Sequence, residues 1–194
     1  MKSENTYLFF DTETTGLPRN WKAPVSNLDN WPRLVQLAYL YYDAQGNKIA
    51  GGDFIIQPEG FTIPASVSNI HGITTKRAME EGCALKTVLQ DFSLLIDEAD
   101  VLVAHNMSFD EKILGAEFLR MGMKNLILAK QKICTMESTT SFCALHGPYG
   151  YKWPKLSELH RKLFRCDFEE AHNAAVDITA TAKCFWELRR IGKL

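Results

Sequence analysis

The stretch YLFFDTE, residues 7–13, joins a continuous apolar run to two acidic residues. The apolar part, residues 7–10, has the length and composition of a strand that is buried on both faces. Asp11 and Glu13 follow at its end, and residues two apart in a strand point to the same face, roughly 6.5–7 Å apart. The stretch therefore predicts a central strand that presents two carboxylates to one point, although a solvated strand end would show the same pattern.

A second acid follows another apolar run. Residues 101–104, VLVA, predict a buried strand, and the stretch HNMSFD, residues 105–110, leads from it into a helix. Ser108 and Glu111 have the spacing of a capping box, which places Asp110 in the first helical turn. The helix dipole favours an acid at this position, so a purely structural role for Asp110 competes with a functional one.

A third acidic stretch, HNAAVD, covers residues 172–177. His172 and Asp177 are five residues apart, a spacing that does not place them on one face of a helix. They can meet if His172 lies in a loop or a frayed first turn and Asp177 lies about one turn into the helix. A capping histidine followed by an exposed aspartate is the structural alternative.

The pattern of the remaining chain predicts an α/β fold. A long loop over residues 14–32 and a hairpin turn at residues 44–47 separate the first three strands. Strands come first and then alternate with helices, which indicates a sheet of mixed strand direction. The predicted strands are residues 7–10, 34–42, 49–57, 101–104 and 132–135, and the predicted helices are residues 84–98, 108–122, 156–164 and 174–190.

Composition narrows the class of protein. With 194 residues and 46% hydrophobic content, the chain predicts a single domain over residues 1–194. A net charge of -1 gives no broad cationic face, so nucleic-acid binding would depend on contacts at the site itself. No apolar run approaches the roughly 20 residues that span a bilayer, so we expect no membrane partner. Five scattered cysteines and no signal peptide predict buried, reduced thiols in a cytoplasmic protein.

The acidic stretches together resemble the DEDD-type 3′-to-5′ exonucleases, in the branch whose third motif carries histidine. Residues 9–16, FFDTETTG, resemble the first family motif, and residues 103–110, VAHNMSFD, resemble the second. Residues 172–177 have the H-x(4)-D spacing of the third. Two weaker matches, IHGIT at residues 70–74 and LSEL at residues 156–159, agree with the family. The resemblance spans about residues 7–185 and implies a ribonuclease-H-like fold, a mixed five-stranded sheet flanked by helices.

The resemblance also implies a two-metal mechanism. Converging acids repel one another unless cations or protons neutralise them, and an oxygen-only site suits Mg²⁺ or Mn²⁺. Asp11, Glu13 and Asp177 are expected to hold one ion, and Asp11 with Asp110 to hold the second. His172 is expected to take the proton from the attacking water, because imidazole can act as a base near neutrality.

Several further residues are predicted to contact the substrate. Leu17 and Phe109 are candidates for a wedge between the last two bases, although helical spacing also places Phe109 in the core. Tryptophans in the long loop either cover the substrate or pin the loop, and a basic cluster over residues 152–165 either contacts phosphates or forms a solvated helix face. The predicted substrate-binding set is Thr14, Gly16, Leu17, His71, Ile73, Asn106 and Phe109.

The resemblance predicts an enzyme that releases nucleoside 5′-monophosphates from DNA 3′ ends, in proofreading, repair or turnover. The sequence shows no obvious docking tail. It therefore favours a free-standing nuclease, or one that meets a DNA polymerase partner through its folded surface. The alternative is an RNA 3′-to-5′ exonuclease of the ribonuclease T or oligoribonuclease type. No residue in the sequence indicates whether the site accepts or excludes the 2′-hydroxyl of RNA. A non-catalytic nucleic-acid-binding module is disfavoured because all four acids and the histidine are present.

Overall fold

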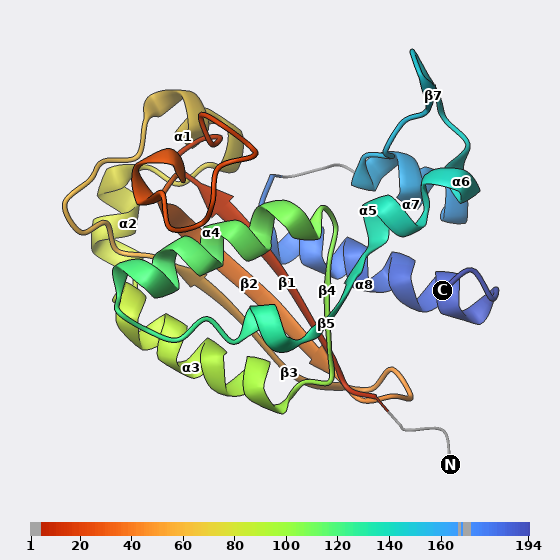
Figure 1. The fold of residues 1–194 in the computed structure, drawn as a ribbon, viewed down its shortest axis with the longest axis horizontal. Coiled ribbons are helices and arrows are strands. Elements are labelled where there is room, and N and C mark those ends of the chain that lie inside the picture. The colour runs from red at the N-terminus through yellow and green to blue at the C-terminus, as the bar shows by residue number, and fades with distance from the viewer. Residues whose placement is uncertain (1–4, 167, 169–171) are drawn as a thin grey trace.

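A mixed five-stranded sheet forms the centre of the molecule (Figure 1). The computed structural model describes residues 5–166, 168 and 172–194. The strands stand in the order β3-β2-β1-β4-β5, so β1 is central, as its unbroken apolar run predicts. Their bounds are β1 Tyr7–Thr14, β2 Leu34–Tyr42, β3 Lys48–Ile55, β4 Val101–Ala104 and β5 Gln131–Cys134.

The direction of strand pairing changes at β1. This strand runs antiparallel to β2 along its whole length but pairs in parallel with β4 only over residues 7–9. Beyond Phe9, no strand of the described residues pairs with β1 on that side. Ligands of open α/β sheets bind outside the carboxyl ends of the strands at such a change in connectivity, and Asp11 and Glu13 lie there.

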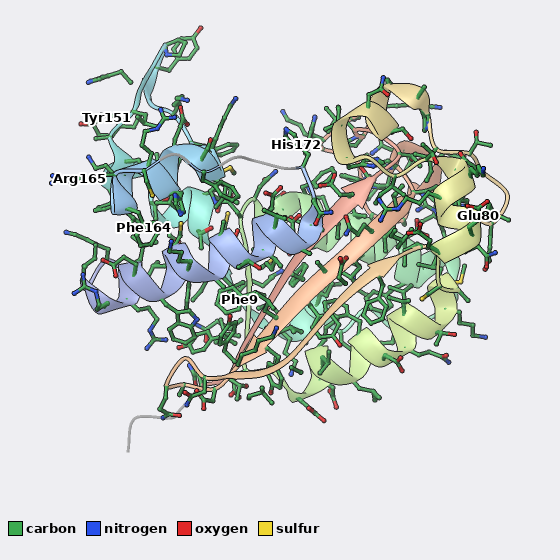
Figure 2. All side chains as sticks on the ribbon, turned by 180° about the vertical axis from the view of Figure 1, so that it is seen from behind. Phe9, Glu80, Tyr151, Phe164, Arg165 and His172 are labelled. Atoms are coloured by element: carbon green, nitrogen blue, oxygen red, sulfur yellow. The ribbon has the colours of Figure 1, made fainter. Side chains whose placement is uncertain are left out.

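Helices cover both faces of the sheet, and the alternation along β1 decides which face meets which helix. Phe9 packs against Phe185 of α8 (Ala174–Arg190), with ring centroids 5.1 Å apart. Phe10 points to the opposite face and packs against Phe92 of α3 (Leu85–Glu98), with centroids 5.7 Å apart. The helix α4 (Met107–Arg120) lies with α3 in front of the sheet in Figure 1, whereas α8 comes to the front in Figure 2.

Most predicted elements are confirmed. The bounds of β4, α7 (Leu156–Phe164) and α8 are those predicted, and α3 begins one residue later. β1 extends to Thr14, so the two acids lie inside the strand and not beyond it. The elements that the sequence did not predict are η1 (Leu28–Asn30), α1 (Ala65–His71), α2 (Thr75–Glu81), η2 (Ile127–Ala129), α5 (Thr135–Ser138), α6 (Thr140–Cys143), β6 (His146–Gly147) and β7 (Gly150–Tyr151).

The predicted capping box is wrong. Helix α4 begins at Met107, so Ser108 lies inside the first turn, and Asn106 takes the N-cap position with a left-handed φ of 76°. Glu111 accepts a hydrogen bond from Lys132 of β5 at 2.6 Å instead of reaching back to the helix end. The prediction that Asp110 lies in the first turn is confirmed.

A buried carboxylate fixes the long loop between β1 and β2. Glu117 of α4 is fully buried and pairs with Arg33 and Arg120, each at 2.9 Å. It also accepts a hydrogen bond from the backbone N–H of Leu34 at 3.0 Å. Trp31 is 3% exposed, and Arg120 donates to its carbonyl, so this tryptophan pins the loop and does not face a substrate.

The five cysteines are free thiols, and two of them, Cys143 and Cys184, are buried as predicted. The prediction of buried thiols is wrong for Cys83 and Cys166, which are exposed. Among the helices of the described residues, none has the length and apolar character that crossing a membrane requires.

Candidate active site

Three of the predicted acids meet at one point. Carboxylate oxygens of Asp11, Glu13 and Asp177 all lie within 4.8 Å of one another. The strand alternation explains the meeting, since Asp11 and Glu13 continue the row of Phe9 on the face that α8 covers. Asp177 lies in the first turn of α8, where that helix passes over the end of β1.

A strand residue and a capping residue hold the start of α8 in place. Asn173 accepts hydrogen bonds from the backbone N–H groups of Ala175 at 3.0 Å and Val176 at 3.4 Å, which fixes the first turn. The side chain of Gln36 accepts from the backbone N–H of Ala174 at 3.3 Å. Gln36 stands opposite Glu13 in the pairing of β1 with β2, so the same strand pair positions both sides of the acidic cluster.

Asp110 reaches the site from the other face of the sheet. Thr12, between the two acids of β1, points toward α4 and donates to the carboxylate of Asp110 from its hydroxyl at 2.7 Å and from its backbone N–H at 3.1 Å. Asp110 is 2% exposed. It lies close enough to raise the pKa values of Asp11 and Glu13 by charge repulsion, so the four acids form one electrostatic unit.

The acids of this cluster favour protons or cations. Burial, followed by repulsion from Asp110, Glu13 and Asp177, raises the pKa of Asp11 well above its usual value. Burial and the charges of Asp177 and Asp110 raise the pKa of Glu13 to about 8. Burial raises the pKa of Asp110 to about 7 against the lowering effect of the Thr12 hydrogen bonds. At neutral pH these carboxylates fit hard divalent cations, which take oxygen ligands and would remove the repulsion.

His172 lies beside the acids, on the open side of the site. It is exposed, has a left-handed φ of 40°, and stands two residues before α8, in the loop position that the sequence predicts. Figure 2 shows it at the start of that helix, above the end of the sheet. With Asp11, Asn106 and Asp177 it lines a pocket of about 380 Å³, so an imidazole and the acids face one space.

Comparison with known proteins places the chain in a family. The sequence profile of the RNase_T exonuclease family matches residues 8–185. The chain belongs to the RNase_T exonuclease family. This family is part of the DEDD superfamily that the three acidic motifs resemble, so the predicted membership is confirmed.

Relatives of this exonuclease-family chain include parts of much larger proteins. It is 29% identical over 194 residues to a PolC-type DNA polymerase III of Listeria innocua, covering 97% of this chain and 12% of the relative. It is 32% identical over 187 residues to a DNA polymerase III subunit epsilon-like protein of Rhodobacter capsulatus, covering 94% and 23%. The chain therefore spans less than a quarter of the length of these two curated relatives.

Solved structures share the fold of this exonuclease-family chain. E. coli Exonuclease I in complex with a dA16 oligonucleotide superposes with a TM-score of 0.75 at 19% identity, over 96% of this chain and 41% of the other. Exonuclease I from Methylocaldum szegediense superposes with a TM-score of 0.74 at 19% identity, over 96% of this chain and 40% of the other. The predicted ribonuclease-H-like fold is confirmed.

The predicted substrate residues fall into two groups. Leu17 is 72% exposed and Asn106 lines the pocket, so both are accessible to a ligand. The hydroxyl of Thr14 donates to the carbonyl of Gly16 at 2.6 Å and fixes the turn that carries Leu17. Gly16 has a φ of 148°, which favours glycine there.

The other three substrate residues have structural contacts. Ile73 is 1% exposed in a small core cluster, so its side chain is not available for the predicted substrate contact. His71 is 6% exposed, and its Nδ1 accepts from the backbone N–H of Ile73 at 3.1 Å. Phe109 packs on the core and lies 5.8 Å from the ring of Trp21, so core packing accounts for much of its surface.

Two of the three positioning residues, Thr12 and Gln36, were not predicted from the sequence. Thr12 and Gln36 orient Asp110 and the start of α8, as described above. His105 links the site to a distant loop, since its Nε2 lies 3.1 Å from the carbonyl of Pro154 and its Nδ1 lies 2.9 Å from the hydroxyl of Thr135. Strand alternation alone would have indicated Thr12, but no sequence pattern reveals the other contacts.

Proposed function

We propose that residues 1–194 act as one exonuclease domain that hydrolyses DNA from the 3′ end and releases nucleoside 5′-monophosphates. The convergence of Asp11, Glu13 and Asp177 in an exonuclease-family chain is the observation that carries this proposal. Asp11, Asp177 and His172 face a pocket that is open to solvent, as hydrolysis at a strand end requires.

The proposed roles follow from the positions of the side chains. Asp11, Glu13 and Asp177 would hold one divalent ion, and Asp11 with Asp110 would hold a second. When bound, such ions polarise the phosphodiester and offset its developing negative charge. Thr12 keeps the carboxylate of Asp110 oriented, because two of its donors are fixed on one oxygen.

His172 is proposed as the general base. Its loop position leaves the ring accessible, whereas Asp177 is fixed in the first helical turn. The imidazole takes a proton from water as the water oxygen attacks the terminal phosphodiester phosphorus. The bond from phosphorus to the 3′-oxygen of the preceding nucleotide breaks, and that oxygen gains a proton to become the new 3′-hydroxyl.

Similarity to DNA enzymes favours DNA over RNA as the substrate. The relatives are named as DNA polymerase III proteins, and one structural neighbour was solved with a dA16 oligonucleotide. A DNA polymerase as partner is proposed on the same basis, with proofreading as the corresponding role. RNA remains the second candidate, because stacking and phosphate contacts do not discriminate the sugar.

Digestion of three 5′-end-labelled substrates tests the proposal, namely single-stranded DNA, duplex DNA with a 3′ mismatch, and RNA of the same sequence. We expect a ladder that shortens from the 3′ end, requires Mg²⁺ or Mn²⁺ and is faster on DNA. The variant Asp11→Asn, purified in parallel, should give no ladder and so exclude a contaminating nuclease. Faster degradation of RNA would assign the second candidate, and equal degradation in excess EDTA would contradict the metal-dependent mechanism.

A further inference from the structure

A hairpin beside the site exposes three large aromatic side chains. Strands β6 and β7 form this hairpin, which projects beyond α7 and away from the sheet in Figure 1. Tyr149 at its tip is 103% exposed, Tyr151 is 52% exposed and Trp153 is 61% exposed. Burying an aromatic ring is strongly favourable, so three exposed rings within five residues mark an interaction surface more than a structural one.

The aromatic hairpin, residues 146–153, is continuous with the pocket that holds the acids. Trp153 and Lys155 line that pocket together with Asp11 and Asp177. The contact of His105 with the carbonyl of Pro154 ties the root of the hairpin to the corner of the site. Figure 2 shows Tyr151 on the projecting lobe and His172 at the start of α8, on the same side of the molecule. A ligand leaving the pocket past Trp153 would therefore meet the hairpin.

The charge of this region fits a polyanion. Residues 146–165 contain five Lys or Arg side chains and one carboxylate, Glu158, although the whole chain has a net charge of -1. Lys152 pairs with Glu158 at 2.6 Å. The described segment therefore keeps a local positive excess next to the aromatic rings, which attracts phosphates.

We infer that the aromatic hairpin is a stacking platform for the unpaired bases that precede the 3′ end of a single strand. The inference rests on the proposed function, because it takes the terminal phosphodiester to lie at the acids. Aromatic rings stack on any base and cationic side chains follow the backbone, so the platform would accept single strands without regard to sequence. Tyr149 lies in the turn of the hairpin and Tyr151 ends β7 two residues later, so both rings lie near its exposed tip.

The test compares a long substrate with one that cannot reach the hairpin. The long substrate is a 16-residue oligo(dT), and the short one is the p-nitrophenyl ester of thymidine 5′-monophosphate. Tyr149→Leu/Tyr151→Leu removes the flat rings but keeps an apolar surface, and Tyr149→Phe/Tyr151→Phe keeps the rings as the matched control. Leu128→Ala, at a side chain that is 71% exposed in the short helix η2, controls for the loss of any exposed apolar group.

We expect the leucine pair to raise the KM for the 16-mer by roughly 5- to 160-fold, as the loss of one stacked base predicts, and to leave ester hydrolysis unchanged. The phenylalanine pair and Leu128→Ala should behave as wild type. Anisotropy of a labelled 16-mer in EDTA gives a second readout, and the leucine pair should bind correspondingly more weakly.

Two outcomes separate the inference from the proposed function. If the Tyr149→Leu/Tyr151→Leu variant matches wild type on the 16-mer in both KM and affinity, the inference of a stacking platform is overturned, although the protein is a nuclease. If the wild-type protein hydrolyses neither substrate, the proposed function fails, and the anisotropy measurement still decides whether the hairpin binds a single strand. Affinity for a blunt duplex equal to that for the single strand would also overturn the inference.

Discussion

Replacing Glu13 by Gln is expected to stabilise the metal-free protein at alkaline pH. The pKa of Glu13 is raised from 4.5 to about 8 by burial and by the charges of Asp177 and Asp110. Between these pH values the folded protein keeps a proton that the unfolded chain has lost. The wild-type free energy of unfolding therefore falls as pH rises through this window. Glutamine does not titrate, so the free energy of unfolding of the variant does not show this decrease.

The size of the effect follows from the shift. At 1.36 kcal/mol for each pKa unit, the change from 4.5 to about 8 sets an upper bound of about 5 kcal/mol. Glu13 is only half-buried, so solvent screening reduces the expected gain to about 2–3 kcal/mol at pH 8 relative to pH 5. For a chain of this size that free energy corresponds to a difference in Tm of roughly 5–10 °C.

Thermal unfolding in EDTA at pH 5 and pH 8, for wild type and Glu13→Gln, measures the difference. The variant should match wild type at pH 5 and unfold at a higher Tm at pH 8. Groups outside the acidic cluster with shifted pKa values, such as His71, are common to both proteins and cancel in the comparison. Glu13→Gln also removes one of the charges that raise the pKa of Asp11, which changes the stability at pH 8 in the same direction. Glu59→Gln, at an exposed acid, is the control. Parallel Tm curves for wild type and Glu13→Gln from pH 5 to pH 8 would refute the existence of a repelling acidic cluster.

Three other substitutions test separate parts of the structure. His172→Ala should lower kcat by roughly 10²- to 10⁴-fold while Mn²⁺ affinity, measured by calorimetry, stays unchanged; a near-normal rate would remove this histidine from the base role. Thr12→Val should weaken Mn²⁺ affinity or activity by about 10- to 100-fold, because Asp110 loses its hydroxyl donor, and a wild-type rate and affinity would argue against this orienting role. Glu117→Ala should lower the free energy of unfolding in urea by about 3–5 kcal/mol, since it leaves the partly buried Arg33 without its partner; a loss below 1 kcal/mol would show that the pair is not structural.

Long elements with clear periodicity could be predicted from the sequence. The apolar run of β1 and the helical spacing of α3 leave little choice of structure, because each must bury a continuous surface. The short helices α1 and α2, of seven residues each, were missed. Their small core cluster provides too few apolar residues to set a period.

The acids of the site were predictable, but their supports were not. Alternation along one strand places Asp11 and Glu13 on one face without any knowledge of the fold. The contact between Gln36 and Ala174 joins residues 138 positions apart and depends on the register of β1 with β2. The capping box failed for a similar reason, since Lys132 of a neighbouring strand competes for Glu111.

Anomalous diffraction from a crystal soaked in Mn²⁺ tests the central claim most directly. The claim is that Asp11, Glu13 and Asp177 form a binding site for divalent cations. We expect an anomalous peak bonded to all three carboxylates, and no peak there in crystals of Asp177→Asn. An ordered crystal in which Mn²⁺ binds elsewhere, or in which these carboxylates remain without the ion, would contradict the account.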